Sequence, residues 1–426
     1  MKRKIDNIFL VGTYLIVGIA KWQISFLIVA QLLLLVCIIR GFLRGYLHKL
    51  IPLFIFFPVS YLYFLGTEIV NIFCIVYILY FFKKYRKIKI FSYQIIIYMF
   101  ILYLMTIVIE YNISGAIKSV ISFIFLILVL QELYHKKYFD EFCESYILAI
   151  ISATIYGMNI YTEALRNTLW ARPRYLLSFI DPNYAGFFLT LGIAILIFRK
   201  AIFSKWIWSI GFVISLISIV LTLSSTAIIC NICLILVWGP YILKRNFYNI
   251  KKILKYLIFI ILFLIIALPI LLKKIPSLTL TFKRFSQKIL MFFNGNSSLA
   301  TTGRSDIWRE NLIFFFNNNS LIHQIFGGQY LTDIGFDQRY FTIVSHQFYI
   351  DSLICFGYIG LLIIVVIEIN ELVIKWKNKN NDGISGLVFT MNLVWILYSF
   401  GLSMFPSWIF SLIWLIKVEN KKRGVK

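Results

Sequence analysis

Long apolar runs recur along the whole chain, and they restrict its possible folds more than any other feature. Most are about 15–24 residues long, close to the roughly 20 residues that a helix needs to cross a hydrocarbon core of ~30 Å. Lipid cannot satisfy backbone hydrogen bonds, so a spanning segment must be a helix or a strand of a closed barrel, and these runs lack the alternation of barrel strands. The sequence therefore predicts an all-α, polytopic integral membrane protein.

Composition excludes a soluble fold. Hydrophobic residues make up 61% of the chain and charged residues 14%, whereas soluble domains contain about 45–50% and about 25%. No small-residue cleavage site follows the first run, so we expect that run to be retained as a span. The cysteines lie mostly inside apolar runs, which favours buried packing over a disulfide framework.

The runs predict about 12–14 transmembrane helices, because the first and the last are short enough to lie at the interface instead. The expected spans fall near residues 7–20, 24–39, 50–65, 70–82, 93–109, 120–133, 146–160, 182–198, 206–221, 227–243, 257–272, 345–368, 386–403 and 406–416.

Basic residues concentrate in alternate connectors, and by the positive-inside rule both termini are then cytoplasmic. The segments 161–181 and 273–344 fall outside, the second as one large extracytoplasmic loop, and both carry arginines against the trend. We therefore divide the chain into N-terminal transmembrane helices (1–160), a core with both outer loops (161–368), and C-terminal helices with a cytoplasmic tail (369–426). The net charge of +24 belongs mostly to connectors, so membrane lipid is an expected partner and nucleic acid is not.

A polar segment in the large loop is the first candidate site. If residues 301–315 are helical, one face carries Arg304, Trp308, Leu312 and Phe315. Residues 302–305 suit the start of that helix, where free N–H groups and the helix dipole favour an anion, and a guanidinium adds bidentate grip on a diphosphate. The alternative is an amphipathic helix lying on the membrane, with Arg304 reaching the headgroups.

His346 stands where the chain re-enters an apolar run. A neutral imidazole at this boundary can accept a proton near pH 7; the alternative is an interfacial histidine without a partner. If the helix continues through the run, one face carries the following residues: His346, Ile350, Leu353, Gly357 and Gly360. The two glycines on that face would permit close helix packing.

The shorter outer loop carries Arg172 and Arg174 and ends in Asp181-Pro182-Asn183. Asp181 suits a helix cap and Pro182 the first helical turn, so their structural role needs no catalysis. No such local structural role explains Arg174.

Several common site patterns are absent from the sequence. It has no Gly-rich phosphate loop, no Walker pattern, no His-Glu-x-x-His motif and no serine-nucleophile elbow. Neither a metal nor a cofactor is expected. The few acids near predicted spans, Glu68, Glu110 and Glu368, fall at span ends, whereas ion-coupled transporters place charged groups near the midplane.

Taken in order, these segments resemble the motifs of the O-antigen polymerase and O-antigen ligase superfamily (Wzy-type and WaaL-type membrane proteins). The matching stretches are Arg174 with Asp181-Pro182-Asn183, then Thr302-Gly303-Arg304 through Trp308, then Phe326-Gly327-Gly328-Gln329, then His346-Gln347-Phe348-Tyr349 with Gly357 and Gly360. The sequence departs from the family pattern at three places. Leu177 stands where that family usually has Gly, Gln347 where it has Asn, and the tract 223–226 where many members have Ser-Arg.

The resemblance implies a metal-independent glycosyltransferase of a bacterial cytoplasmic (inner) membrane, with its active site facing the outside or the periplasm. Its substrate would be an oligosaccharide repeat unit on undecaprenyl diphosphate, polymerised into capsule or O-antigen. A flippase and a chain-length regulator of the same pathway are candidate partners. A ligase differs only in its acceptor, and a lipid-linked oligosaccharide flippase or polysaccharide transporter is the alternative of another class.

The resemblance also implies roles for individual residues. Arg174 and Arg304 would stabilise charge on the leaving diphosphate, and His346 would be the base on the acceptor hydroxyl, with Asp306 and Asp351 as alternative bases. The candidate substrate-binding residues are Arg172, Trp308, Arg309, Asn183 and Tyr349.

Overall fold

The computed structural model describes residues 2–22, 24–57, 63–64, 67–85, 113–166, 175–179, 181–222, 224–245, a few positions between 283 and 294, and residues 304–318, 320–327, 345, 347–379, 382–402 and 408–418. In these residues regular structure is helical, apart from one short antiparallel pair, β1 (Tyr63–Phe64) and β2 (Thr67–Glu68). The all-α prediction is thus confirmed in outline. The predicted spans 93–109 and 257–272 lie outside the described residues.

The helices of the first half are α1 (Lys2–Ile19), α2 (Ile24–Arg44), η1 (Leu47–Leu50), α3 (Ile51–Phe56), α4 (Ile69–Lys84), α6 (Ile113–Leu133) and α7 (Lys136–Arg166). Those of the second half are α8 (Pro182–Phe198), η2 (Lys200–Ile202), α9 (Lys205–Thr222), α10 (Ser225–Arg245), α14 (Arg304–Asn318), α15 (Leu321–Phe326), α16 (Phe348–Asn378), α17 (Gly383–Ser399) and α18 (Trp408–Leu415).

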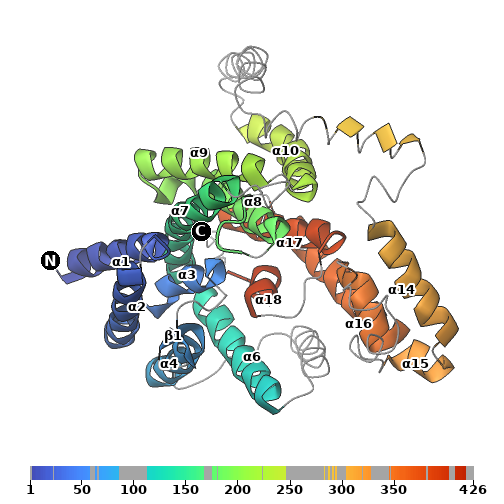
Figure 1. The fold of residues 1–426 in the computed structure, drawn as a ribbon, viewed down its shortest axis with the longest axis horizontal. Coiled ribbons are helices and arrows are strands. Elements are labelled where there is room, and N and C mark those ends of the chain that lie inside the picture. The colour runs from blue at the N-terminus through green and yellow to red at the C-terminus, as the bar shows by residue number, and fades with distance from the viewer. Residues whose placement is uncertain are drawn as a thin grey trace, which may run out of the picture.

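Four helical segments of the described part are long and apolar enough to cross a membrane: Ser25–Arg44, Lys136–Tyr161, Lys205–Thr222 and Phe348–Asn378. Shorter apolar helices accompany them, among them Pro182–Phe198 and Gly383–Ser399. Near the middle of the molecule α8 packs against α7, α9, α10 and α17 (Figure 1). Nearly all of α8 is buried, so its packing fixes the positions of the residues at its two ends.

The predicted span 50–65 is wrong. The helix α3 ends at Phe56, where the N–H of Phe57 bonds to the carbonyl of Leu53, and Tyr63–Phe64 is a strand. The residues of α3 are buried against α7. An apolar run this short can pack in a protein core instead of crossing lipid, and the residues of α3 lie in the core.

The prediction of one continuous helix over 345–368 is also wrong, because α16 folds back on itself. At Gly357 the backbone has φ 64° and ψ −167°, which is not helical. The Tyr349 hydroxyl donates to Glu368 Oε2 at 2.9 Å across a separation of 19 residues, a distance of about 28 Å on a straight helix. Residues 348–356 are therefore a short arm that returns along a long arm, 358–378.

This fold-back also removes the predicted stripe of His346, Ile350, Leu353, Gly357 and Gly360. Gln347 caps the helix, so the position of His346 precedes it, and Gly357 forms the turn between the arms. A Cβ on Gly360 would collide with Phe356 of the short arm. Gly360 thus permits close approach, as predicted, but between the two arms of one hairpin.

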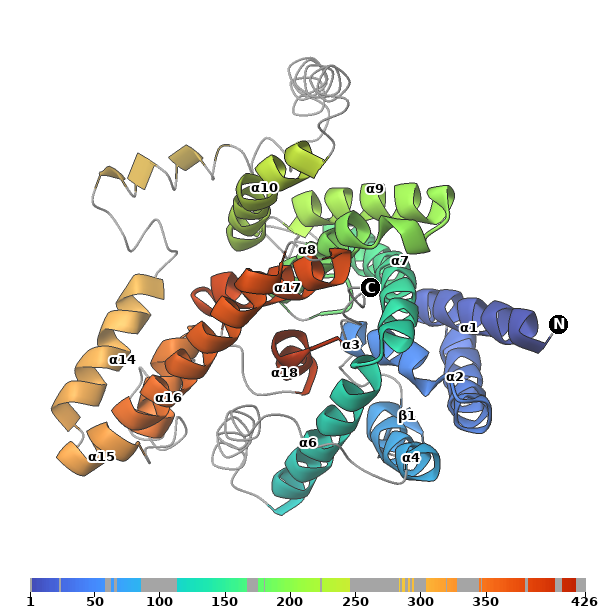
Figure 2. The ribbon, with the colours of Figure 1, turned by 180° about the vertical axis from the view of Figure 1, so that it is seen from behind.

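The long arm packs antiparallel to α17. Trp376 contacts Phe389 with ring centroids 5.2 Å apart, and further along the arm Trp395 Nε1 donates to Glu368 Oε1 at 3.3 Å. The helices α14 and α15 lie beside α16 at the end of the molecule away from α1 and α2, in both views (Figure 2). This arrangement brings the start of α14 to the end of α17.

Candidate anion site at the helix starts

The start of α8 is built by the predicted cap. Asp181 Oδ1 accepts from the backbone N–H of Asn183 at 2.6 Å, and Pro182 occupies the first turn. Asn183 Oδ1 accepts from the hydroxyl of Ser224 at 2.7 Å. Ser224 also caps α10, since its oxygen accepts from the N–H of Ala227 at 3.2 Å. Buried side chains therefore join the starts of α8 and α10.

Arg304 brings the start of α14 to the same region. Its Nη1 donates to the carbonyl oxygen of Gly401 at 2.6 Å. A Cβ on Gly401 would lie 3.3 Å from the Thr226 hydroxyl oxygen and 4.0 Å from that Nη1 atom. The guanidinium therefore lies beside the first turn of α10 and the residues that follow α17, where a larger residue at 401 would crowd it.

The predicted face of α14 is confirmed. Arg304 and Trp308 contact other elements through side-chain hydrogen bonds, and Leu312 and Phe315 pack with residues of α16. Arg309 lies off this face and is exposed. The alternative, in which Arg304 reaches the headgroups, does not describe its side chain here, because Nη1 donates to the carbonyl of Gly401.

The start of α16 joins the group through Trp308. The indole Nε1 donates to the carbonyl of Ser345 at 2.8 Å, and the Ser345 hydroxyl donates to Asp351 Oδ1 at 2.5 Å. Asp351 is buried, with 1% of its surface exposed. The charges of Asp181, Asp351 and Arg304 all act on the hydroxyl of Tyr184 of α8, so this tyrosine lies near all three. The starts of α8, α10, α14 and α16 therefore gather around Arg304.

Helix starts carry unpaired N–H groups and a partial positive charge, and together with a guanidinium they favour an anion. Three carboxylates lie at these helix starts: Asp181 caps α8, Asp351 is bonded to Ser345, and Asp306 lies in the first turn of α14. The arrangement is thus a candidate anion site, with hydroxyl and amide groups of Thr226, Ser224 and Asn183 nearby.

The structure describes residues at all three positions where the sequence differs from the pattern that it resembles. Leu177 has φ 54°, the left-handed conformation that glycine adopts with least strain. Gln347 caps α16 by accepting from the N–H of Ile350 at 2.5 Å, a role for which Asn is among the most favoured residues. Ser224 and Thr226, from the third departing tract, contact Asn183 and the neighbourhood of Arg304.

The remaining predicted site residues are distributed as follows. Arg172, Arg174 and His346 lie outside the described residues. Tyr349 lies next to the site, with its ring 5.1 Å from that of Phe400, but its hydroxyl is bonded to Glu368. The structure therefore brings Arg304, Trp308 and Asn183 to one region and assigns Tyr349 a bond within the α16 hairpin.

Sequence reasoning missed the buried charges of the long arm. Glu368 lies near the middle of this arm rather than at a span end, and Tyr349 and Trp395 donate to its two oxygens. On the same arm, Glu371 pairs with Lys417 at 2.9 Å, and Lys375 donates to Asn392 Oδ1 at 2.9 Å. The spacing 368, 371, 375 on one helix face was a visible signal for a buried polar stripe.

A second buried charged cluster lies between η1, α4, α6 and α7. Glu132, fully buried, accepts from Lys84 Nζ at 2.7 Å and from the hydroxyls of Tyr77 and Tyr80. His48 Nε2 lies 2.7 Å from Glu141 Oε2. In this cluster every carboxylate has a partner, so we interpret it as a structural network.

Comparison of the chain with protein-family models and with curated proteins finds no match. The resemblance to the O-antigen polymerase and ligase superfamily accordingly stays a hypothesis drawn from the motifs.

Proposed function

We propose that this protein is a polysaccharide repeat-unit polymerase of a bacterial cytoplasmic membrane, producing capsule or O-antigen. It would transfer a glycan chain from undecaprenyl diphosphate to the next lipid-linked repeat unit on the outer face. One observation carries the proposal: Arg304 lies where the starts of α8, α10, α14 and α16 gather, an arrangement that fits a diphosphate leaving group. The long apolar helices support a membrane location.

In this reaction the acceptor hydroxyl attacks the anomeric carbon, the bond to the diphosphate oxygen breaks, and undecaprenyl diphosphate leaves with the electron pair. Arg304 stabilises the charge that develops on that oxygen, and the resemblance implies the same role for Arg174 and substrate binding for Arg172. Since the diphosphate is an acidic leaving group, no general acid is required. His346 takes the proton of the acceptor hydroxyl, with Asp351 as the alternative base.

Two other functions are open to test. A ligase would use the same arginines and another acceptor. A flippase or transporter is favoured by one observation, the buried Glu368 in the middle of the long arm, because ionisable residues inside spans often mark a transport path. Tyr349 and Trp395 already bond both of its oxygens, which favours a structural role.

The test is complementation of a strain that lacks the gene. The strain receives wild type, Arg304→Ala, Arg304→Lys or Arg44→Ala, the membrane level of each protein is measured, and surface glycan is resolved by length. Arg44→Ala is the matched control because it removes the same charge from an exposed position at the end of α2, which has no part in the candidate site. We expect a normal ladder from this control and a rate loss of about 10²–10³ from Arg304→Ala, seen as single exported units without the long ladder.

Other outcomes separate the alternatives. Polymer that accumulates on its lipid carrier indicates a ligase, and absence of repeat units from the outer face indicates a flippase. A normal ladder from Arg304→Ala at wild-type protein level would remove Arg304 from the reaction. His346→Ala and Arg174→Ala, assayed in the same way, test the residues outside the described part of the chain.

A further inference from the structure

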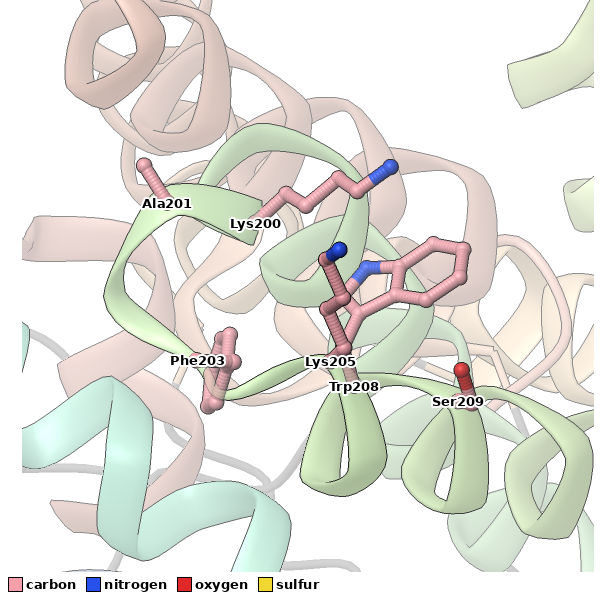
Figure 3. A pocket seen from close by; sticks show the side chains of 6 residues that line it. All are labelled: Lys200, Ala201, Phe203, Lys205, Trp208 and Ser209. Carbon is pink, nitrogen blue, oxygen red and sulfur yellow. The ribbon is translucent and has the colours of Figure 1, made fainter.

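A pocket of about 610 Å³ lies at the end of α8 that is farthest from the candidate site. Since α8 has 17 residues, the two are separated by about 25 Å along the helix axis. The pocket is therefore independent of the site around Arg304. Its lining residues, drawn in Figure 3, are Lys200, Ala201, Phe203, Lys205, Trp208 and Ser209.

The pocket presents positive charge. Lys200 and Lys205 are exposed, and none of the six lining residues is acidic. The adjacent Arg199 forms an ion pair with Asp140 of α7, so that carboxylate is engaged by the arginine. Lys200 Nζ lies 4.6 Å from the centroid of the Trp208 ring, and both lysine side chains reach toward the indole (Figure 3).

Trp208 gives the pocket a fixed wall. Its Nε1 donates to the carbonyl of Leu196 at 2.8 Å, and its ring stacks on that of Phe212 with centroids 5.3 Å apart. A tryptophan held in this way suits the boundary between headgroups and hydrocarbon, where its ring is apolar and its edge polar. Ammonium groups beside it bind phosphate as point charges.

An apolar stripe leads away from the pocket along α9. Val213, Leu216 and Val220 follow the pocket residue Ser209 at helical spacing and are exposed, with Val213 53% exposed. The helix is one of those long and apolar enough to cross a membrane. A ligand that occupies the pocket with an anionic group can therefore lay a hydrocarbon chain along this stripe.

We propose that the pocket at the α8–α9 connection binds one anionic phospholipid, its phosphodiester between Lys200 and Lys205 and an acyl chain along α9. Charge complementarity selects an anionic headgroup, and the adjoining stripe selects a lipid over free phosphate. The proposal depends on the membrane location of the chain and is independent of the polymerase activity.

The test is native mass spectrometry of the full-length protein in detergent, titrated with phosphatidylglycerol or with phosphatidylcholine. We expect tighter retention of phosphatidylglycerol by the wild type, and about 10–30-fold weaker retention by K200Q/K205Q, since each lysine contributes about fivefold in affinity. K200R/K205R keeps both charges and should keep the lipid. The matched control is K377Q/K379Q, which also removes two charges and disrupts a second lysine–tryptophan contact, Lys379 over Trp376.

Three outcomes would overturn the proposal. K200Q/K205Q could retain phosphatidylglycerol as the wild type does, or the control could lose as much. In a third arm, inorganic phosphate and glycerol phosphate compete for the pocket at millimolar concentration. If they displace the lipid as readily as a second phosphatidylglycerol does, the ligand is the phosphate group alone and the apolar stripe has no role. Thermal unfolding of each variant separates lost binding from lost structure.

Discussion

Gly357→Ala tests the fold-back of α16, because a hairpin and a continuous helix predict opposite signs. A continuous helix gains about 1 kcal/mol when alanine replaces an interior glycine. In the hairpin, φ of 64° with ψ of −167° is a conformation that alanine rarely adopts, and forcing it costs about 1–3 kcal/mol. The two structures therefore differ by about 2–4 kcal/mol in the expected effect on unfolding.

Steric overlap adds to the loss in the hairpin. A Cβ at position 357 would lie 2.5 Å from the carbonyl oxygen of Ile325, 2.6 Å from that of Gln324 and 2.6 Å from the amide nitrogen of Gly327. These are backbone atoms of α15 and its end, so they cannot rotate away as a flexible side chain could. We expect Gly357→Ala to loosen the contact between α15 and the turn of α16.

The assay is thermal unfolding of the purified protein in one detergent. The readout is the fraction of protein that stays monodisperse as the temperature rises. Gly12→Ala is the control. Gly12 lies inside α1, and a Cβ added to it has no heavy atom within 4 Å, so the melting temperature of this variant should stay unchanged or rise. A melting temperature for Gly357→Ala equal to or above that of the wild type would refute the fold-back.

Two further variants test single contacts by the same unfolding assay. Tyr349→Phe removes the donor to Glu368 and should cost about 1–2 kcal/mol. Combined with Glu368→Gln it should show a coupling energy of about 1 kcal/mol, and strictly additive effects would contradict the contact between the two arms. Asp181→Ala should destabilise the start of α8 by about 1 kcal/mol, while Asp181→Asn, which keeps a capping oxygen, should change it by a few tenths. Equal losses from both would assign Asp181 a role other than capping.

Features set by neighbouring residues could be predicted from the sequence. The cap at Asp181-Pro182 and the face of α14 with Arg304 and Trp308 both agree with the structure. Each depends on the geometry of one helical turn or a few turns, which the identities of nearby residues determine. The motifs also pointed to Arg304 and Asn183, since charged and polar residues at helix starts stand out against apolar surroundings.

Features set by distant residues could not be predicted in this way. Gly357 and Gly360 fit a straight packing stripe as well as a turn, and the contact between Tyr349 and Glu368 decides for the turn. Glu368 lies in the middle of the long arm, and not at a span end as predicted, because α16 continues to Asn378. The end of α3 at Phe56 is different, because Phe57 precedes Pro58 in the sequence and a residue before proline is disfavoured in the helical conformation.

The sequence by itself determined that the chain is helical and rich in segments of membrane length, because helix hydrogen bonds are local and segment length is read directly from the apolar runs. It also placed polar motifs at the starts of several helices. Only the tertiary structure decided that Ser224, Thr226, Arg304, Ser345 and Gly401 lie together. Their contacts join residues far apart in the chain, and such contacts form only once the helices have packed around α8.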